Sequence, residues 1–126
     1  MPAPCPFCSI DPGRVICGNE LAVAIRDAYP ASEGHTLIIP KRHITGILET
    51  TPEEREALFA ILEEARKQLS EALGPDGFNL GINEGVAAGQ TIPHLHIHLI
   101  PRKAGDVANP RGGVRHVMPG KGDYGG

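Results

Sequence analysis

Aromatic residues, cysteines and long apolar runs are all scarce in this 126-residue chain. Tryptophan is absent and aromatic residues make up 4% of the chain, so the core must consist mainly of aliphatic side chains. No run of 18 apolar residues occurs, which excludes the usual membrane-spanning helix, and residues 1–14 lack the apolar segment of a secretion signal. The three cysteines are an odd number, which favours a reduced, cytoplasmic chain over a disulfide framework.

Charge is distributed unevenly along a chain whose length suits one domain. The net charge is -3, yet residues 102–126 carry five basic and two acidic side chains. From 103 onward Gly and Pro interrupt the sequence without any period, so we predict a C-terminal arm (103–126) on a domain of residues 1–102, with its core at about 5–102. A basic arm on an acidic body suits an anionic ligand or a solvated tail equally well.

One helix is predicted over residues 52–73. Thr51 is a capping residue, Pro52 suits the first helical position, and Glu54 completes a capping box. Apolar side chains then recur at helical spacing and Gly74-Pro75 ends the segment. The single apolar face predicts packing against a sheet.

Four short apolar or alternating segments, bounded by turn residues, are predicted strands: 21–26, 35–40, 78–83 and 94–100. Two strands, a helix and two more strands predict an α+β fold with a largely antiparallel sheet.

The segment HLHIHLI places His94, His96 and His98 at every second position. On a regular strand they share one face, successive rings are about 6.6 Å apart and the outer two about 13 Å apart. One metal ion therefore cannot bind all three rings, because zinc–nitrogen bonds are about 2.1 Å long. A row of imidazoles instead suits an anionic substrate, with one ring as nucleophile and its neighbours as donors.

A loop rich in small residues, NEGVAAGQTIP (83–93), ends directly before the first histidine. Its glycines allow backbone N–H groups to approach an anion closely, although such loops are most often simple turns. Its position predicts that the loop and the three histidines share one site.

The stretch GQTIPHLHIHLIPRKAGD resembles the signature of the histidine triad (HIT) family of nucleotidyl hydrolases and transferases, and EGHTLIIPKRH resembles a second family segment. The resemblance covers about residues 5–106. It implies an α+β homodimer with an antiparallel sheet of about five strands, one main helix at 52–73 and a short or absent second helix.

The resemblance also implies a mechanism at the α-phosphate of a nucleoside 5′-phosphate derivative. His96 would attack phosphorus and form a covalent nucleotidyl-histidine, which water or another acceptor resolves. His98 would donate to phosphate oxygens, Gln90 would lie near the scissile atom, and His35 would orient the triad. The nucleotide-binding residues it implies are Asp27 for the ribose, and Asn83, Gly89, Gln90, Thr91 and His98 for the phosphates.

Cys5 and Cys8 form a CxxC motif, which could be a redox pair, two incidental cysteines or half of a zinc site. The redox interpretation needs a strand before and a helix after the motif, and neither is predicted. The resemblance to bacterial family members implies structural Zn²⁺ on Cys5, Cys8, His43 and His94.

Three functions follow as hypotheses. The first is a nucleotidyl hydrolase for a dinucleoside polyphosphate, such as diadenosine tetraphosphate, or a nucleoside phosphoramidate. The second is a hydrolase that uses zinc on His94 and His96, and the third is a nucleotide-binding regulatory protein without turnover. The expected partners are a nucleotide and a second copy of the chain, not nucleic acid or a membrane. The basic side chains Arg111, Arg115, His116 and Lys121 are candidates for distal phosphates, but none is assigned a catalytic role.

Overall fold

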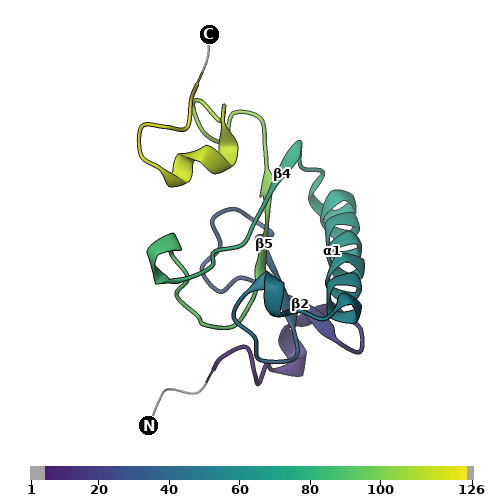
Figure 1. The fold of residues 1–126 in the computed structure, drawn as a ribbon. Helices are drawn as coiled ribbons and strands as arrows, with labels where there is room; N and C mark the ends of the chain where they lie inside the picture. The colour runs from purple at the N-terminus through teal and green to yellow at the C-terminus, as the bar shows by residue number, and fades with distance from the viewer. Residues whose placement is uncertain (1–4, 125–126) are drawn as a thin grey trace.

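The computed structural model describes residues 5–124 and has one sheet with one long helix (Figure 1). The strands are β1 (Val15–Gly18), β2 (Ala22–Arg26), β3 (Thr36–Pro40), β4 (Gly77–Gly81) and β5 (Ile97–Arg102), and the helix is α1 (Pro52–Leu73). The sheet order is β1-β2-β3-β5-β4 and every pair is antiparallel. Short 3-10 turns occupy Pro12–Arg14, Ile47–Glu49, Val86–Ala88 and Gly113–Val117. The predicted α+β fold with a five-stranded antiparallel sheet is confirmed.

Helix α1 has both of its predicted ends. The Thr51 hydroxyl accepts a hydrogen bond from the N–H of Glu54, and the Glu54 carboxylate accepts one from the N–H of Thr51. Gly74 follows in the left-handed conformation and closes the helix. The Arg42 guanidinium adds two bonds to the buried Glu54 carboxylate and lowers its pKa to about 2, so the start of α1 is tied to the end of β3.

The two faces of the sheet carry different cores. Residues from β2, β3 and β5 pack against α1 on one face, and Leu95, Ile97 and Leu99 all belong to this cluster, as predicted. A second cluster on the other face contains Phe7, Ile25, Leu37 and Ile39. His98 lies directly across from Leu37 in the β3–β5 register, which places it on the face away from α1.

The strand that carries the histidines begins later than predicted, because β5 starts at Ile97 and His94 and His96 precede it. The register that pairs Ile38 with Ile97 would bring Leu95 opposite Pro40, which has no N–H to continue the ladder. The N–H of Leu95 donates instead to the carbonyl of Ile44. Strand β1 was not predicted, because it is a four-residue strand without alternation.

The C-terminal arm has local structure of its own within residues 103–124. It contains the turn Gly113–Val117 and lies beside β4 (Figure 1, yellow). Asp123 accepts a hydrogen bond from Asn109 and pairs with Arg111, while Arg115 lies over the ring of Tyr124.

Among the described residues, no helix has the length and apolar character needed to cross a bilayer.

Candidate active site and metal centre

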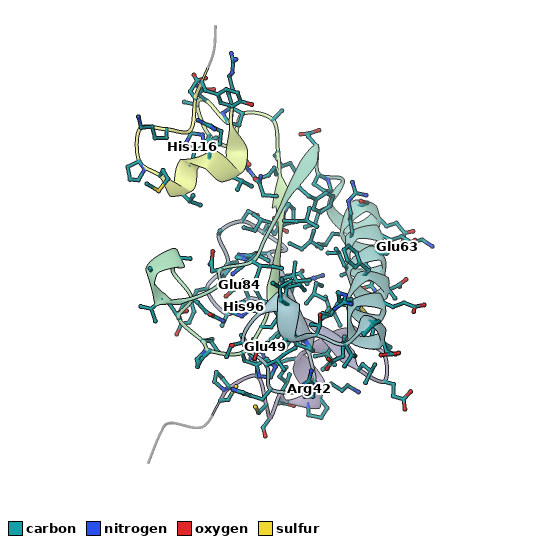
Figure 2. All side chains as sticks on the ribbon, in the orientation of Figure 1. Arg42, Glu49, Glu63, Glu84, His96 and His116 are labelled. Carbon is teal, nitrogen blue, oxygen red and sulfur yellow. The ribbon has the colours of Figure 1, made fainter. Side chains whose placement is uncertain are left out.

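A cavity of about 520 Å³ opens on the face of the sheet away from α1. Figure 2 shows His96 on this side of the sheet. Of the residues predicted to bind or transfer a nucleotide, the cavity brings together Asp27, Asn83, Gly89, Thr91, His96 and His98. Phe7, Arg14 and Tyr29, which the sequence had not indicated, also line it.

The His96 ring is buried and has one defined hydrogen-bond partner. Its Nδ1 lies 2.8 Å from the carbonyl oxygen of His94, which can only accept, so Nδ1 carries the proton. In the neutral form of the ring, the lone pair is therefore on Nε2. This tautomer is the one that a nitrogen nucleophile requires.

The His98 ring is held in the opposite tautomer by a chain of three groups. The N–H of Ala31 donates to Nδ1 of His35 at 2.9 Å, so the His35 proton resides on Nε2. That Nε2 lies 2.9 Å from Nδ1 of His98, which accepts, and the His98 proton is consequently on Nε2. Neighbouring rings thus present a lone pair from His96 and an N–H donor from His98.

Burial favours the neutral forms of His35 and His98 in this hydrogen-bond chain. Desolvation lowers the pKa of His35, against an opposing effect of Asp27, whose Oδ2 lies 3.5 Å from Nε2 of His35. Desolvation also lowers the pKa of His98, and the nearby His96 and His35 rings lower it further. Both rings are therefore neutral near pH 7 and can keep their fixed tautomers.

Asp27, His35 and His98 are close enough to suggest a metal site, with one ligand atom from each within 4.8 Å of the others. The chemistry argues against a metal ion there. The Ala31 N–H occupies the lone pair of His35 Nδ1, so His35 Nε2 carries a proton and cannot coordinate. We interpret this group as a hydrogen-bond chain.

Asp27 follows the last residue of β2, and its carboxylate is oriented by the backbone. The N–H of Tyr29 donates to Oδ1 at 2.9 Å, and the N–H of Asp27 itself donates to the carbonyl of His35. The carboxylate therefore lies at the cavity wall next to the histidine chain, where it can accept hydrogen bonds from a polyol such as ribose.

Gln90 does not line this cavity, although its neighbours Gly89 and Thr91 do. Its Oε1 accepts from the N–H of Gly85 and its Nε2 donates to the carbonyl of Thr45. The side chain thus holds the loop between β4 and β5 against the segment after β3. Its predicted place near the scissile atom remains a prediction.

Cys5, Cys8, His43 and His94 come together in a second cluster, with one ligand atom from each within 4.8 Å of the others. The Sγ–Nδ1 distances are 3.3 Å for Cys5–His94, 3.0 Å for Cys8–His43 and 3.6 Å for Cys8–His94. A tetrahedral zinc ion separates sulfur and nitrogen ligands by about 3.5 Å, so these distances suit zinc.

The tautomer of His94 also suits a metal ion. Its Nε2 lies 2.8 Å from the carbonyl oxygen of Pro40 and donates to it, which leaves the Nδ1 lone pair directed at the two cysteines. Burial lowers the pKa of His94, which favours the neutral ring that coordination needs. Two thiolates would offset the charge of a divalent cation, and four protein ligands leave no open position.

Phe7 connects the two clusters. It lies between Cys5 and Cys8 in the chain, is buried, and contacts the rings of His94 and His96 edge-on at centroid distances of 6.0 and 5.1 Å. An apolar residue inside a CxxC motif is the only sequence signal for this position. Its partners are close to 90 residues away in sequence, so the contact becomes evident only in the fold.

The family model described as HIT domain matches residues 10–105 of the chain. The chain belongs to the HIT domain family. The family resemblance that the histidine triad signature indicated is therefore confirmed.

Three curated relatives of this HIT domain protein have names that include an activity. The chain is 42% identical to Adenylylsulfatase HINT3 of Arabidopsis thaliana, over 81% of this chain and 54% of the relative. It is 36% identical to the bis(5′-nucleosyl)-tetraphosphatase [asymmetrical] of Schizosaccharomyces pombe (74% and 51%) and 33% identical to AP-4-A phosphorylase of Mycobacterium tuberculosis (80% and 52%). The chain spans about half the length of each.

Two solved structures have the same fold over most of both chains. A zinc-bound histidine triad family protein from Mycobacterium smegmatis superposes with a TM-score of 0.74 at 37% identity, covering 83% of this chain and 79% of that one. A HIT family protein from Bacillus subtilis superposes with a TM-score of 0.76 at 30% identity, covering 93% and 88%.

Proposed function

We propose that the protein is a nucleotidyl hydrolase or transferase that cleaves a dinucleoside polyphosphate or a nucleoside phosphoramidate at the α-phosphate. The observation that carries the proposal is the pair of opposite tautomers at His96 and His98, beside a cavity large enough for a nucleotide. Family membership and relatives named for nucleotide cleavage support it at the level of the reaction class.

In the proposed reaction, Nε2 of His96 attacks the α-phosphorus, and the bond from phosphorus to the leaving group breaks with its electron pair on the leaving group. The Nδ1 proton stays on His96 and is stabilised by the carbonyl of His94. Nε2–H of His98 donates to a non-bridging oxygen as charge develops there. Water, or inorganic phosphate, then attacks the phosphorus of the nucleotidyl-histidine. The phosphorus–nitrogen bond breaks with its electron pair on Nε2 of His96, and the proton of an attacking water passes to the solvent.

The substrate is positioned by the other residues of the cavity in this proposal. Asp27 accepts hydrogen bonds from the ribose hydroxyls, Thr91 and the backbone at Gly89 donate to phosphate oxygens, and Asn83 lines the phosphate position. His35 maintains the tautomer of His98 without touching the substrate.

We further propose that the Cys5, Cys8, His43 and His94 cluster binds structural zinc, which when bound supplies a rigid link between the N-terminal segment and the residue next to His96. The donor set, its spacing and the zinc-bound relative support this assignment. Since His94 faces this cluster and His96 has no atom in it, the geometry favours the histidine nucleophile over a zinc hydrolase that uses His94 and His96.

A panel of three substrates tests the function. Purified protein is incubated with diadenosine tetraphosphate, diadenosine triphosphate or adenosine 5′-phosphoramidate, with and without inorganic phosphate, and products are separated by chromatography. Release of AMP from at least one substrate is expected, and ADP in place of AMP when phosphate is present would identify a phosphorylase. Binding of AMP without turnover of any substrate would contradict the enzymatic proposal and favour a regulatory protein.

A homodimer is also part of the proposal. β4 is an edge strand, and beside it a cavity of about 310 Å³ is bordered by Phe59 (66% exposed) and Leu80 (42% exposed). An unpaired edge next to an apolar surface suits a second copy of the chain. Light scattering should give the mass of two chains for wild type and one chain for Phe59→Glu; a monomeric wild type would contradict the dimer.

A further inference from the structure

A second cavity of about 480 Å³ lies between the sheet and the C-terminal arm, and none of the predicted functions accounts for it. We call it the arm pocket. Its walls are the end of β4 with Leu80, part of β5 with His98 and Ile100, and the turn of the arm with Val114 and Val117. It is close in volume to the cavity that we assign to the nucleotide.

The arm pocket and the nucleotide cavity meet at two shared residues. His98 and Asn83 line both, whereas His96 lines only the nucleotide cavity. A phosphate chain that starts at His96 and passes His98 and Asn83 therefore enters the arm pocket. The next part of the substrate beyond the transferred phosphate would lie there.

The chemistry of the walls suits a nucleoside better than further phosphates. Leu80, Val114 and Val117 are exposed apolar side chains, while Asn79 and His116 supply polar groups at the edge. A flat ring with a polar rim fits such a surface, as apolar walls with a few polar groups are typical of small-molecule sites.

Two of the basic side chains, Arg111 and Arg115, make contacts within the arm itself, and their contact with distal phosphates remains a prediction. Arg111 Nε pairs with Asp123 at 3.3 Å, and Arg115 lies 4.3 Å from the ring centre of Tyr124 and donates to the carbonyl of Lys121. Neither arginine lines the arm pocket. They hold the turn Gly113–Val117 in place, so the pocket wall is already formed before a ligand arrives.

We propose that the arm pocket binds the second nucleoside, the leaving half of a dinucleoside polyphosphate. This inference rests on the proposed function and narrows its substrate class. Adenosine 5′-phosphoramidate has only an ammonia-sized leaving group, which does not reach the arm pocket, whereas a dinucleoside polyphosphate has two nucleosides and fills both cavities.

The test is Val117→Asp, which places a charge in the arm pocket at a side chain that is 74% exposed and so tolerates substitution. Met118→Asp is the matched control, because Met118 is the next residue of the same arm, is 62% exposed and does not line the arm pocket. We expect Val117→Asp to lower kcat/KM for diadenosine tetraphosphate by about tenfold or more and to leave adenosine 5′-phosphoramidate within about twofold. The control should change neither.

Equal loss with both substrates, or no loss with either, would overturn the inference, as would a wild type that cleaves only the phosphoramidate. A change of mass by light scattering without a change in substrate preference would make the pocket an interface between copies. Binding of a non-hydrolysable diadenosine tetraphosphate analogue and of AMP is measured in parallel. Weaker binding of the analogue alone supports the arm pocket even if wild type releases no AMP, an outcome that would reject only the proposed reaction.

Discussion

Replacement of His96 by alanine should lower AMP release by at least about a thousandfold with every substrate that the wild-type protein accepts. The lone pair on Nε2 of His96 is the nucleophile in our proposal. Among the described rings, His96 alone has its Nδ1 proton held by the His94 carbonyl, which keeps Nε2 free to attack. The change is measured as kcat under saturating substrate, with AMP followed by chromatography.

Binding should survive this substitution, because Asp27, Asn83 and Thr91 line the cavity independently of His96. Titration of the His96→Ala variant with AMP, together with its thermal unfolding, separates loss of the nucleophile from loss of the fold. Retention of wild-type turnover in a folded variant would reject His96 as the nucleophile and reopen the zinc-hydrolase alternative.

Cys8→Ser should release the metal and lower the melting temperature by about 10 °C or more, since a structural zinc ion contributes several kcal/mol of folding free energy. The expected result is a zinc content near zero by elemental analysis, against about one ion per wild-type chain. Chelation of the wild-type protein should reproduce the loss of stability.

Cys17→Ser is the matched control, because it is the same substitution at a half-buried cysteine outside the cluster. It should retain wild-type zinc content and lose far less stability. Equal zinc content in Cys8→Ser and Cys17→Ser would contradict the metal site at the N-terminus.

Activity should also fall when the metal is lost, by about tenfold to a hundredfold rather than completely. Phe7 lies between the two cysteines and contacts the His96 ring, so release of residues 5–8 loosens one side of the nucleophile and one wall of the cavity. The loss should appear in both kcat and KM. Addition of zinc to the chelated wild-type protein should restore both.

Local sequence signals were sufficient for helix α1, because its cap, its apolar spacing and its glycine end all lie within the helix and its flanks. They were also sufficient to place Leu95, Ile97 and Leu99 in the core. The start of β5 was wrong by three residues, since it depends on Pro40, a residue of another strand that cannot continue the ladder.

The site shows the same division between local and distant information. The alternation of histidine with apolar residues was enough to predict that His94, His96 and His98 share one face. The family resemblance added His35 and Asp27 as site residues. The tautomers could not be predicted, because they depend on the N–H of Ala31 and the carbonyl of His94 in the folded chain. Phe7 and the arm pocket were missed for the same reason, as both arise from segments distant in sequence.

A covalent bond between the nucleotide and His96 is the intermediate of the proposed reaction, and mass spectrometry of peptides from the quenched protein can detect it. Wild-type protein is mixed with diadenosine tetraphosphate, quenched within one turnover at alkaline pH, where a phosphorus–nitrogen bond survives, and then digested. We predict a mass increase of one adenylyl group on the peptide that carries His96, and none in the His96→Ala variant. Continued turnover with no adduct, or an adduct on another residue, would contradict the account.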